Sequence, residues 1–294
     1  MHKRIVRKDG SVIILLPQKE TKAITFEVLY KVGSRQENDK NNGASHFVEH
    51  LMFKGTDKRP DTATISRELD GIGAEYNAFT GKDHTGYYIK ADSSHFPLAV
   101  EMLSDMLHNS KFDKAEVDRE RGVIIEEINM YEDNPLMYIE DVFENLLYQG
   151  TNLGRLIAGP RENIRNITRN SLYNYYQKYY YAGNSVIAVA GNFKEAQVLK
   201  LIGKFFPVIK KKARVKNSQT KMTKQVAPRV TILSRNDLEQ VQLTLGFRSV
   251  AKNDPKFLVS QVLSNILGGN MSSRLFLQIR PFKNLPYRFQ TRRL

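Results

Sequence analysis

The segment His46-Phe-Val-Glu-His50 constrains the fold of this chain more than any other feature of its sequence. The two histidines are four residues apart, so on a helix both imidazoles project from one face. At that spacing two imidazole nitrogens can reach one metal ion at about 2.0–2.1 Å. Glu49 lies beside them, where a carboxylate can accept a proton from water at the ion. We therefore expect residues 43–55 to form a helix, with a further metal ligand supplied from elsewhere in the chain.

A long amphipathic segment, residues 113–134, is expected to be the helix that supplies this further ligand. Its carboxylates include those of Glu120, Glu126 and Glu127. Glu120 and Glu127 are about two helical turns apart and share a face, whereas Glu126 points about 100° away from Glu127. A catalytic zinc site has three protein ligands and one open position. The helical phase favours Glu127 as the third ligand, and Glu126 is the alternative.

The chain contains no cysteine, which excludes disulfide bonds and thiolate metal sites. Any transition metal therefore has to be held by His, Asp or Glu. His84, His95 and His108 have no second ligand at metal-binding spacing, and His2 lies at the N-terminus. We expect these four histidines to be ordinary surface or hydrogen-bonded residues. The predicted metal site therefore depends on the two histidines of the helix.

The pattern of apolar residues predicts an α+β fold for residues 1–209, with helices packed against an antiparallel sheet. Period-two and β-branched runs predict the strands, and helical periodicity with capping residues predicts the helices. Strands are expected within 1–20, 23–34, 74–81, 84–92 and 185–192, and helices at 43–55, 62–73, 93–110, 113–134 and 168–180.

A change in composition predicts a second, smaller unit near the C-terminus. Residues 210–226 are polar, basic and without sustained apolar periodicity, which is typical of a linker. Beyond them, residues 229–234 and 241–247 are expected to form strands, and residues 256–269 a helix. We therefore expect an incomplete second domain at 227–294.

The formal net charge of +14 is concentrated in the last third of the chain. Residues 196–294 hold 20 Lys and Arg against 3 Asp and Glu. Polybasic stretches bind phosphate backbones, but this one coincides with the predicted linker and carries no nucleic-acid-binding motif. A nucleic-acid partner is therefore not expected. The apolar run at residues 12–16 is too short for a signal peptide or a membrane span, so we expect a soluble, cytoplasmic protein.

Six motifs extend over nearly the whole chain: HFVEHLMFKGT, GAEYNAFTGKDHTGYY, ERGVIIEEINMYEDNP, LGRLIAGPRENI, SVIAVAGN and LGGNMSSRLFLQIR. As a set they resemble the pitrilysin family, which includes insulin-degrading enzyme and mitochondrial processing peptidase. The order His-x-x-Glu-His is that of the inverzincins. The resemblance implies a zinc-binding domain followed by a second domain of similar fold, of which this chain holds only the first part.

The resemblance also implies the ligands of the metal. One Zn²⁺ per chain would be held by His46, His50 and Glu127. Glu49 would be the general base that activates water for attack on a peptide carbonyl. Glu120, at the family's upstream glutamate, would orient a ligand from behind it or tune the site.

Four further residues match substrate-binding positions of the family. Asn77 and Ala78 match the edge strand that pairs with the backbone of the substrate. Arg280 and Tyr287 keep the spacing of an Arg and a Tyr that help to bind substrate in the second domain. This chain departs from the family between those two, where it has two prolines and lacks a glycine. We interpret the sequence from about residue 281 as truncated or frame-shifted.

These features predict a zinc-dependent endopeptidase that hydrolyses peptide bonds in extended peptides or unfolded protein segments. The alternative is an inactive or partner-dependent family member that binds zinc or peptide without turnover. Processing peptidases of this family resemble heterodimers in which one chain catalyses and the other grips the substrate. The sequence is therefore compatible with a partner chain in a homodimer or a heterodimer.

Overall fold

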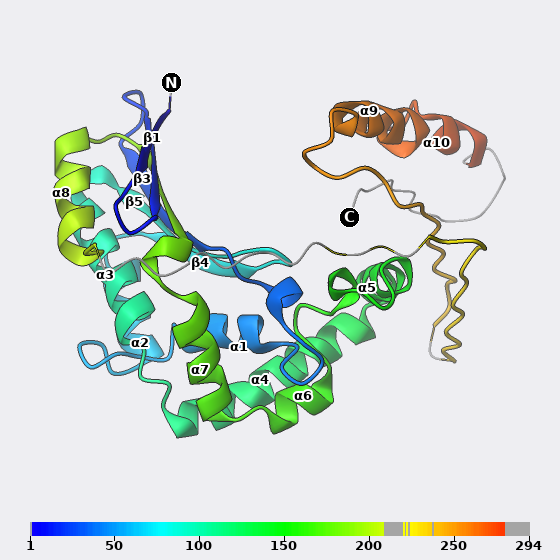
Figure 1. The fold of residues 1–294 in the computed structure, drawn as a ribbon, viewed down its shortest axis with the longest axis horizontal. Coiled ribbons are helices and arrows are strands. Elements are labelled where there is room, and N and C mark those ends of the chain that lie inside the picture. The colour runs from blue at the N-terminus through cyan, green and yellow to red at the C-terminus, as the bar shows by residue number, and fades with distance from the viewer. Residues whose placement is uncertain (1, 209–219, 221, 223, 237, 280–294) are drawn as a thin grey trace. The chain divides into compact units, whose positions relative to one another are not determined.

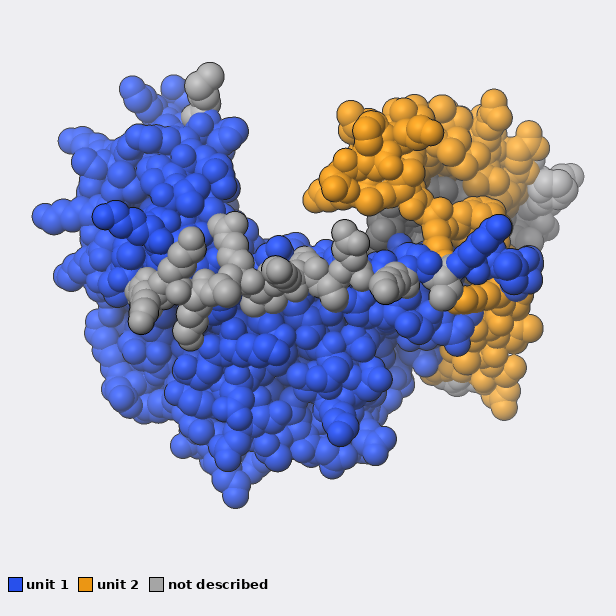
Figure 2. All heavy atoms as spheres, viewed as in Figure 1, with its two compact units in different colours: residues 1–228 blue, residues 229–294 orange. Residues whose placement is uncertain are grey.

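The computed structural model describes residues 2–208, 220, 222, 224–236 and 238–279. It divides the chain into two compact units, residues 1–228 and 229–294 (Figure 2). Most of the expected linker at 210–226 lies outside the described residues, and so do Arg280 and Tyr287. The domain boundaries drawn from the sequence therefore stay predictions, and each unit is described by itself.

A six-stranded sheet forms the centre of the first unit, with the strand order β1-β2-β6-β3-β5-β4 (Figure 1). Its strands are β1 (Lys3–Val6), β2 (Val12–Pro17), β3 (Ala23–Tyr30), β4 (Glu75–Thr80), β5 (Thr85–Asp92) and β6 (Ser185–Gly191). The pairs β1–β2, β3–β6, β3–β5 and β4–β5 are antiparallel, as expected. The pair β2–β6 is parallel, and β6 joins the sheet only after helices α1 to α7, a long crossover of the kind that parallel pairing requires.

One face of this sheet is buried beneath helices, which confirms the predicted α+β fold. Along β3 the buried side chains Ile24, Phe26, Val28 and Tyr30 alternate with half-buried ones. This period of two is the signature of a strand with one covered face. Helix α3 (Phe96–Asn109) packs on β3 and β5, and α1 (Ala44–Leu51) packs on β4 (Figure 1).

Most of the remaining helices of the first unit are preceded by a residue whose side chain caps them. These remaining helices are α2 (Thr62–Asp70), α4 (Lys114–Asp133), α5 (Pro135–Leu147), α6 (Arg161–Asn166), α7 (Arg169–Tyr179) and α8 (Glu195–Phe205). The carboxylates of Asp61 and Asp113 accept hydrogen bonds from backbone N–H groups of α2 and α4, and Thr168 caps α7 in the same way. Among the described residues, no helix combines the length and apolar character that crossing a bilayer requires.

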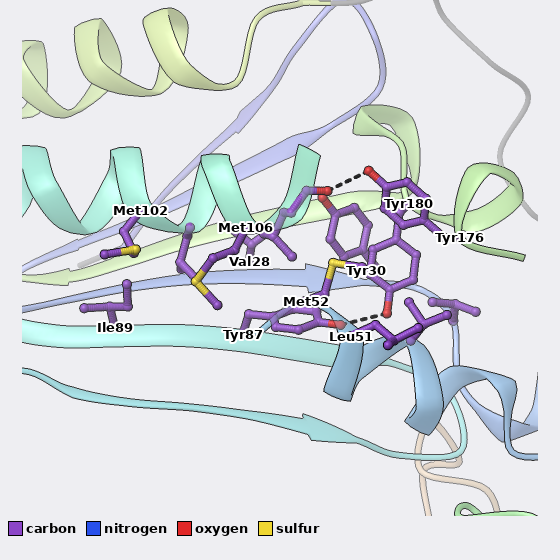
Figure 3. Close-up of a cluster of buried hydrophobic side chains, with 14 of the residues drawn as sticks. Val28, Tyr30, Leu51, Met52, Tyr87, Ile89, Met102, Met106, Tyr176 and Tyr180 are labelled. Carbon is purple, nitrogen blue, oxygen red and sulfur yellow. Dashed lines mark hydrogen bonds between the residues drawn. The ribbon is translucent and has the colours of Figure 1, made fainter. Parts of the chain in front are cut away.

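Buried tyrosines join the sheet to the helices. Tyr30 and Tyr87 from the sheet meet Tyr176 and Tyr180 from α7 and its C-terminal end (Figure 3). The hydroxyl groups of Tyr87 and Tyr180 are hydrogen-bonded to each other at 2.9 Å. A buried hydroxyl needs such a partner, since an unpaired one costs about 1–3 kcal/mol. Leu51, the last residue of α1, and Met52 after it belong to the same buried cluster, which packs this end of α1 against the sheet (Figure 3).

The second unit contains α9 (Phe257–Gly268) and α10 (Arg274–Ile279). The helix expected at 256–269 is confirmed as α9. The strands expected at 229–234 and 241–247 were wrong, since these described residues form no strand. Their apolar side chains are exposed, with Val241 at 95% and Phe247 at 84%. A strand requires a neighbour for its backbone hydrogen bonds, and the described residues offer none here.

Candidate metal centre

Helix α1 carries His46, Glu49 and His50, and its N-terminus is held by a buried carboxylate. Glu37 is 5% exposed and accepts hydrogen bonds from the backbone N–H groups of Gly43 (2.8 Å) and Ser45 (2.7 Å). Gly43 has a φ of 102°, a conformation that favours glycine. A negative group at a helix N-terminus satisfies its free donors and complements its dipole. Glu37 and Gly43 thus fix the residue at which the helix that carries the His-x-x-Glu-His segment begins.

Helix α4 packs against α1 and presents the facing carboxylates. Val117, Glu120, Ile124 and Ile128 form its buried stripe at helical spacing. Glu120 is thereby carried into the interior beside α1, and its side chain is 2% exposed. Glu127 lies one turn beyond Ile124 and is about a quarter exposed, at 25% of its side chain.

Three ligand atoms from the two helices converge on one point. The Nε2 atoms of His46 and of His50 each lie 3.5 Å from Oε2 of Glu127. The ligand atoms of the three residues all lie within 4.8 Å of one another. Two ligands bound tetrahedrally at about 2.0–2.1 Å from a zinc ion are about 3.4 Å apart. The spacing therefore fits a zinc ion with three protein ligands, which leaves a fourth position open.

Glu126, the alternative ligand, lies outside this cluster. Its side chain is exposed and accepts a hydrogen bond from Asn129 at 3.3 Å. Among the described residues, the group with metal-binding geometry consists of His46, His50 and Glu127. The geometry therefore favours Glu127 over its neighbour, in agreement with the helical phase.

The charges around the cluster favour a bound cation. Burial acts to lower the pKa of His50, but hydrogen bonds and charges from Glu120 and Glu127 outweigh it and raise that pKa to about 9. Burial lowers the pKa of His46, and the neighbouring His50 adds to this effect. Hydrogen bonding to His50 lowers the pKa of Glu127. Two carboxylates thus stabilise positive charge at the point where the three ligands meet.

Glu120 lies behind His50 and contacts it directly. The Nδ1 atom of His50 is 3.0 Å from Oε2 of Glu120, so a proton on Nδ1 is donated to the carboxylate and Nε2 faces Glu127. The other carboxylate oxygen accepts a hydrogen bond from Lys54 at 2.7 Å. Sequence reasoning identified Glu120 but missed Lys54. The available signal was its position one helical turn after His50.

Glu49 lies beside the cluster and is held by the edge of the sheet. Thr80, at the end of β4, donates a hydrogen bond from Oγ1 to Oε2 of Glu49. Burial raises the pKa of Glu49, while the Thr80 hydrogen bond and the charge of His50 oppose the rise. A carboxylate with a raised pKa is suited to accept a proton near neutral pH. Thr80 was also missed, since it lies 31 residues from its partner in the sequence.

Asn77 and Ala78 lie on β4, the last strand in the sheet order. Strand β4 pairs with β5 on one side, so among the described residues its other edge has no strand beside it. The backbone N–H of Ala78 points away from β5, because it donates to Oδ1 of Asn77 at 2.8 Å. The edge strand thus offers backbone groups next to the strand end that holds Glu49.

The other histidines lie apart from the cluster. His84 makes an edge contact with the ring of Phe79, at 5.7 Å between ring centroids. His108 contacts the hydroxyl of Ser104 through Nδ1 at 3.2 Å. Arg280 and Tyr287 lie outside the described residues, so their proposed substrate contacts stay predictions.

The fold and the donor set define a class of protein: an α+β unit whose His46, His50 and Glu127 have the geometry to hold a metal ion. A family model described as "Insulinase (Peptidase family M16)" matches residues 12–161, and one described as "Peptidase M16 inactive domain" matches residues 166–292. The chain belongs to this peptidase family, which confirms the resemblance seen in the motifs.

Curated relatives cover nearly the whole chain. An uncharacterized zinc protease of Bacillus subtilis, YmxG, is 35% identical over 287 residues, which is 98% of this chain and 69% of that protein. An uncharacterized zinc protease of Streptomyces coelicolor is 34% identical over 97% of this chain and 63% of its own length. A probable mitochondrial-processing peptidase subunit beta of Arabidopsis thaliana is 34% identical over 84% of this chain and 46% of its own. The chain thus spans about two thirds of the length of the bacterial relatives.

Solved structures show the same fold. A protease from Helicobacter pylori matches with a TM-score of 0.69 and 26% identity, over 74% of this chain and 53% of that one. A peptidase M16 inactive domain from Pseudomonas fluorescens matches with a TM-score of 0.81 over 98% of this chain and 69% of that one. Its identity is 17%, so this likeness bears on the fold alone.

Proposed function

We propose that this chain is the zinc-binding, catalytic part of an endopeptidase that hydrolyses peptide bonds in extended peptides or unfolded segments. One Zn²⁺ per chain would be held by His46, His50 and Glu127. The observation that carries the proposal is the approach of both Nε2 atoms to the same carboxylate oxygen at 3.5 Å. Relatives named zinc proteases support the identity of the metal.

Each residue around the ligands has a part in hydrolysis. A bound zinc ion would supply a Lewis acid that polarises a peptide carbonyl and lowers the pKa of water. Glu49 accepts the proton of the attacking water and passes it to the leaving amine. Thr80 holds the Glu49 carboxylate in place. Glu120 keeps the proton of His50 on Nδ1 and so leaves Nε2 free to bind metal.

The edge strand β4 suits an extended substrate. A peptide that adds to the free edge would pair with backbone groups such as the N–H of Ala78. The Asn77 side chain accepts a hydrogen bond from that N–H in this structure, so it would have to rotate away before a peptide could pair there. The peptide would then run past Thr80, the residue that holds Glu49. Backbone pairing depends little on side chains, which is consistent with a substrate defined by extended conformation.

The second candidate function is that of a partner-dependent or inactive member of the family. It is supported by the relative named as a probable mitochondrial-processing peptidase subunit beta, since that name describes one subunit of an assembly. In that case the first unit would bind zinc and peptide, and turnover would require a further chain or domain. The cytoplasmic location and a dimeric state stay predictions.

Hydrolysis of an unfolded model peptide by the purified, zinc-loaded chain tests the two candidates. The endopeptidase predicts internal cleavage that Glu49→Gln lowers by about 100-fold or more. Glu126→Gln, which alters an exposed neighbour of a ligand, serves as the matched control and should retain activity. Zinc and peptide binding without cleavage would favour the partner-dependent alternative.

A further inference from the structure

We propose that Lys54 is a positioning residue of the metal centre. It fixes the orientation of the Glu120 carboxylate, which in turn holds the His50 ring. The inference rests on the proposed function, since it assigns Lys54 a role in holding zinc. It goes beyond the ligand set, because Lys54 contacts neither a ligand nor the metal position in the described interactions.

The Glu120 carboxylate is held from both of its oxygens. Oε1 accepts from Nζ of Lys54 at 2.7 Å, and Oε2 lies 3.0 Å from Nδ1 of His50. The Glu120 side chain is 2% exposed, so water has little access to either oxygen. The Lys54 side chain, at 22% exposed, covers the outer side of the carboxylate. The Glu120 carboxylate is therefore held by His50, in the last turn of α1, and by Lys54, in the turn that follows it.

Lys54 reaches this position because of the turn that ends α1. Its backbone N–H donates to the carbonyl of Leu51 at 3.2 Å, which continues the turn for three residues beyond the end of α1. Gly55 follows with a φ of 111°, and a Cβ there would lie 2.3 Å from the carbonyl oxygen of Pro60. The turn thus requires glycine and sends the chain away immediately after Lys54. His50 and Lys54 are left one turn apart, on either side of the same carboxylate.

Removal of Lys54 would leave one oxygen of a buried carboxylate without a partner. A buried charged oxygen without a hydrogen bond is costly, so the carboxylate would turn or draw in water to satisfy it. Either change would loosen the contact that keeps the His50 ring facing Glu127. Loss of a hydrogen-bonding contact behind a metal ligand typically weakens metal binding by about 10–100-fold.

Zinc affinity of the full chain, measured by competition with a coloured chelator, tests this role without any need for turnover. Lys54→Met should weaken zinc binding by about 10-fold or more, and Lys54→Arg, which keeps a cationic donor, by much less. Lys58→Met is the matched control, because Lys58 lies in the same loop but pairs with Glu101. It should bind zinc as the unaltered chain does. Circular dichroism of each metal-free variant checks that it is folded.

A double-mutant cycle separates positioning from a general loss of stability. In the Glu120→Gln background, Lys54→Met should cause little further loss of zinc affinity, because the charge it positions is gone. Lys54→Gln, which keeps a neutral donor, provides a second variant if Lys54→Met does not fold. Unchanged zinc affinity in the folded Lys54 variants, or equal losses in both backgrounds, would overturn the inference alone. No zinc binding by the unaltered chain would overturn the proposed function and this inference together.

Discussion

At the scale of single residues, the groups around the metal ligands are held by contacts from distant segments, Thr80 on Glu49 and Glu120 on His50. His46 and His50 share one face of α1, and Glu127 shares a face of α4 with Glu120; both can be read from spacing, and the structure brings the three ligand atoms together. Thr80 and Lys54 act through contacts formed only when distant segments meet. Thr80 lies 31 residues from Glu49 in the sequence, so no local pattern reveals it, and the one local signal for Lys54 is its position one helical turn after His50.

Replacement of Thr80 by Val removes the hydroxyl that donates to Glu49 at nearly constant volume. We expect kcat on a peptide substrate to fall by about 10-fold, which corresponds to one hydrogen bond in the transition state. The zinc content should change little, because the Thr80 side chain is bonded to Glu49 and to no metal ligand in the described interactions. Thr80→Ser should restore most of the activity. A fall in zinc content equal to the fall in kcat would contradict this role.

At the scale of helices and strands, the sequence predicted the helices whose starts depend on local capping residues. It did not predict features that depend on which strands pair. Helices α2, α4 and α7 begin at Asp61, Asp113 and Thr168, whose capping side chains are visible in the sequence. The parallel pairing of β2 with β6 depends on a crossover of the whole unit, which no local pattern encodes. The strands expected at 229–234 and 241–247 needed neighbours that the described residues do not supply.

Helix α1 should depend on the buried carboxylate at its N-terminus. Replacement of Glu37 by Ala leaves the N–H groups of Gly43 and Ser45 without their acceptor. We expect the free energy of unfolding to fall by about 1–3 kcal/mol, as measured by urea denaturation. Glu20→Ala, in an exposed turn, is the control and should cause less than about 0.5 kcal/mol. An equally small effect of Glu37→Ala would show that α1 does not need this cap.

A buried arginine joins α2 and α3 and should make the fold sensitive to acid. Arg59 is 1% exposed and forms ion pairs with Glu68 (2.8 Å), Glu101 (2.6 Å) and Asp105 (3.0 Å). Because removal of one partner leaves buried charges uncompensated, Arg59→Met should cost about 3–5 kcal/mol of unfolding free energy at neutral pH. The exposed Arg67→Met on α2 is the control.

The same ion pairs predict the direction of the pH dependence. Burial acts to raise the pKa of Glu101 and of Asp105, but hydrogen bonds and charge from Arg59 and its neighbours lower each below its ordinary value of 4.5 or 3.8. Carboxyls with lowered pKa values stabilise the fold above those values, and this stabilisation is lost as the pH falls below them. The difference between Arg59→Met and the unaltered chain should therefore shrink below about pH 4. A difference that stays constant down to pH 3 would contradict this reading.

At the scale of the whole molecule, the first unit has a large apolar core beside the metal ligands. Its buried apolar residues extend from the sheet through α3 and α7 to the inner faces of α1 and α4, and the cluster in Figure 3 includes Leu51 of α1. Zinc binding should therefore stabilise a unit that already folds, through mass action.

Removal of zinc with a chelator should lower the Tm of the first unit. The unit should still unfold cooperatively. The expected gain on restoring free zinc to 100 times Kd is about 2.7 kcal/mol. Thermal unfolding followed by circular dichroism checks this, with Glu127→Gln as a control whose Tm should respond less to zinc. A chain that loses its helical signal entirely without zinc would show that the metal is required for folding.

Zinc stoichiometry, measured on the purified chain by elemental analysis after exhaustive dialysis, tests the proposed metal centre most directly. The geometry predicts about one zinc per chain, lost or strongly weakened in Glu127→Gln and retained in Glu126→Gln. A folded chain without specific zinc, or equal zinc content in both variants, would contradict the site that His46, His50 and Glu127 are proposed to form.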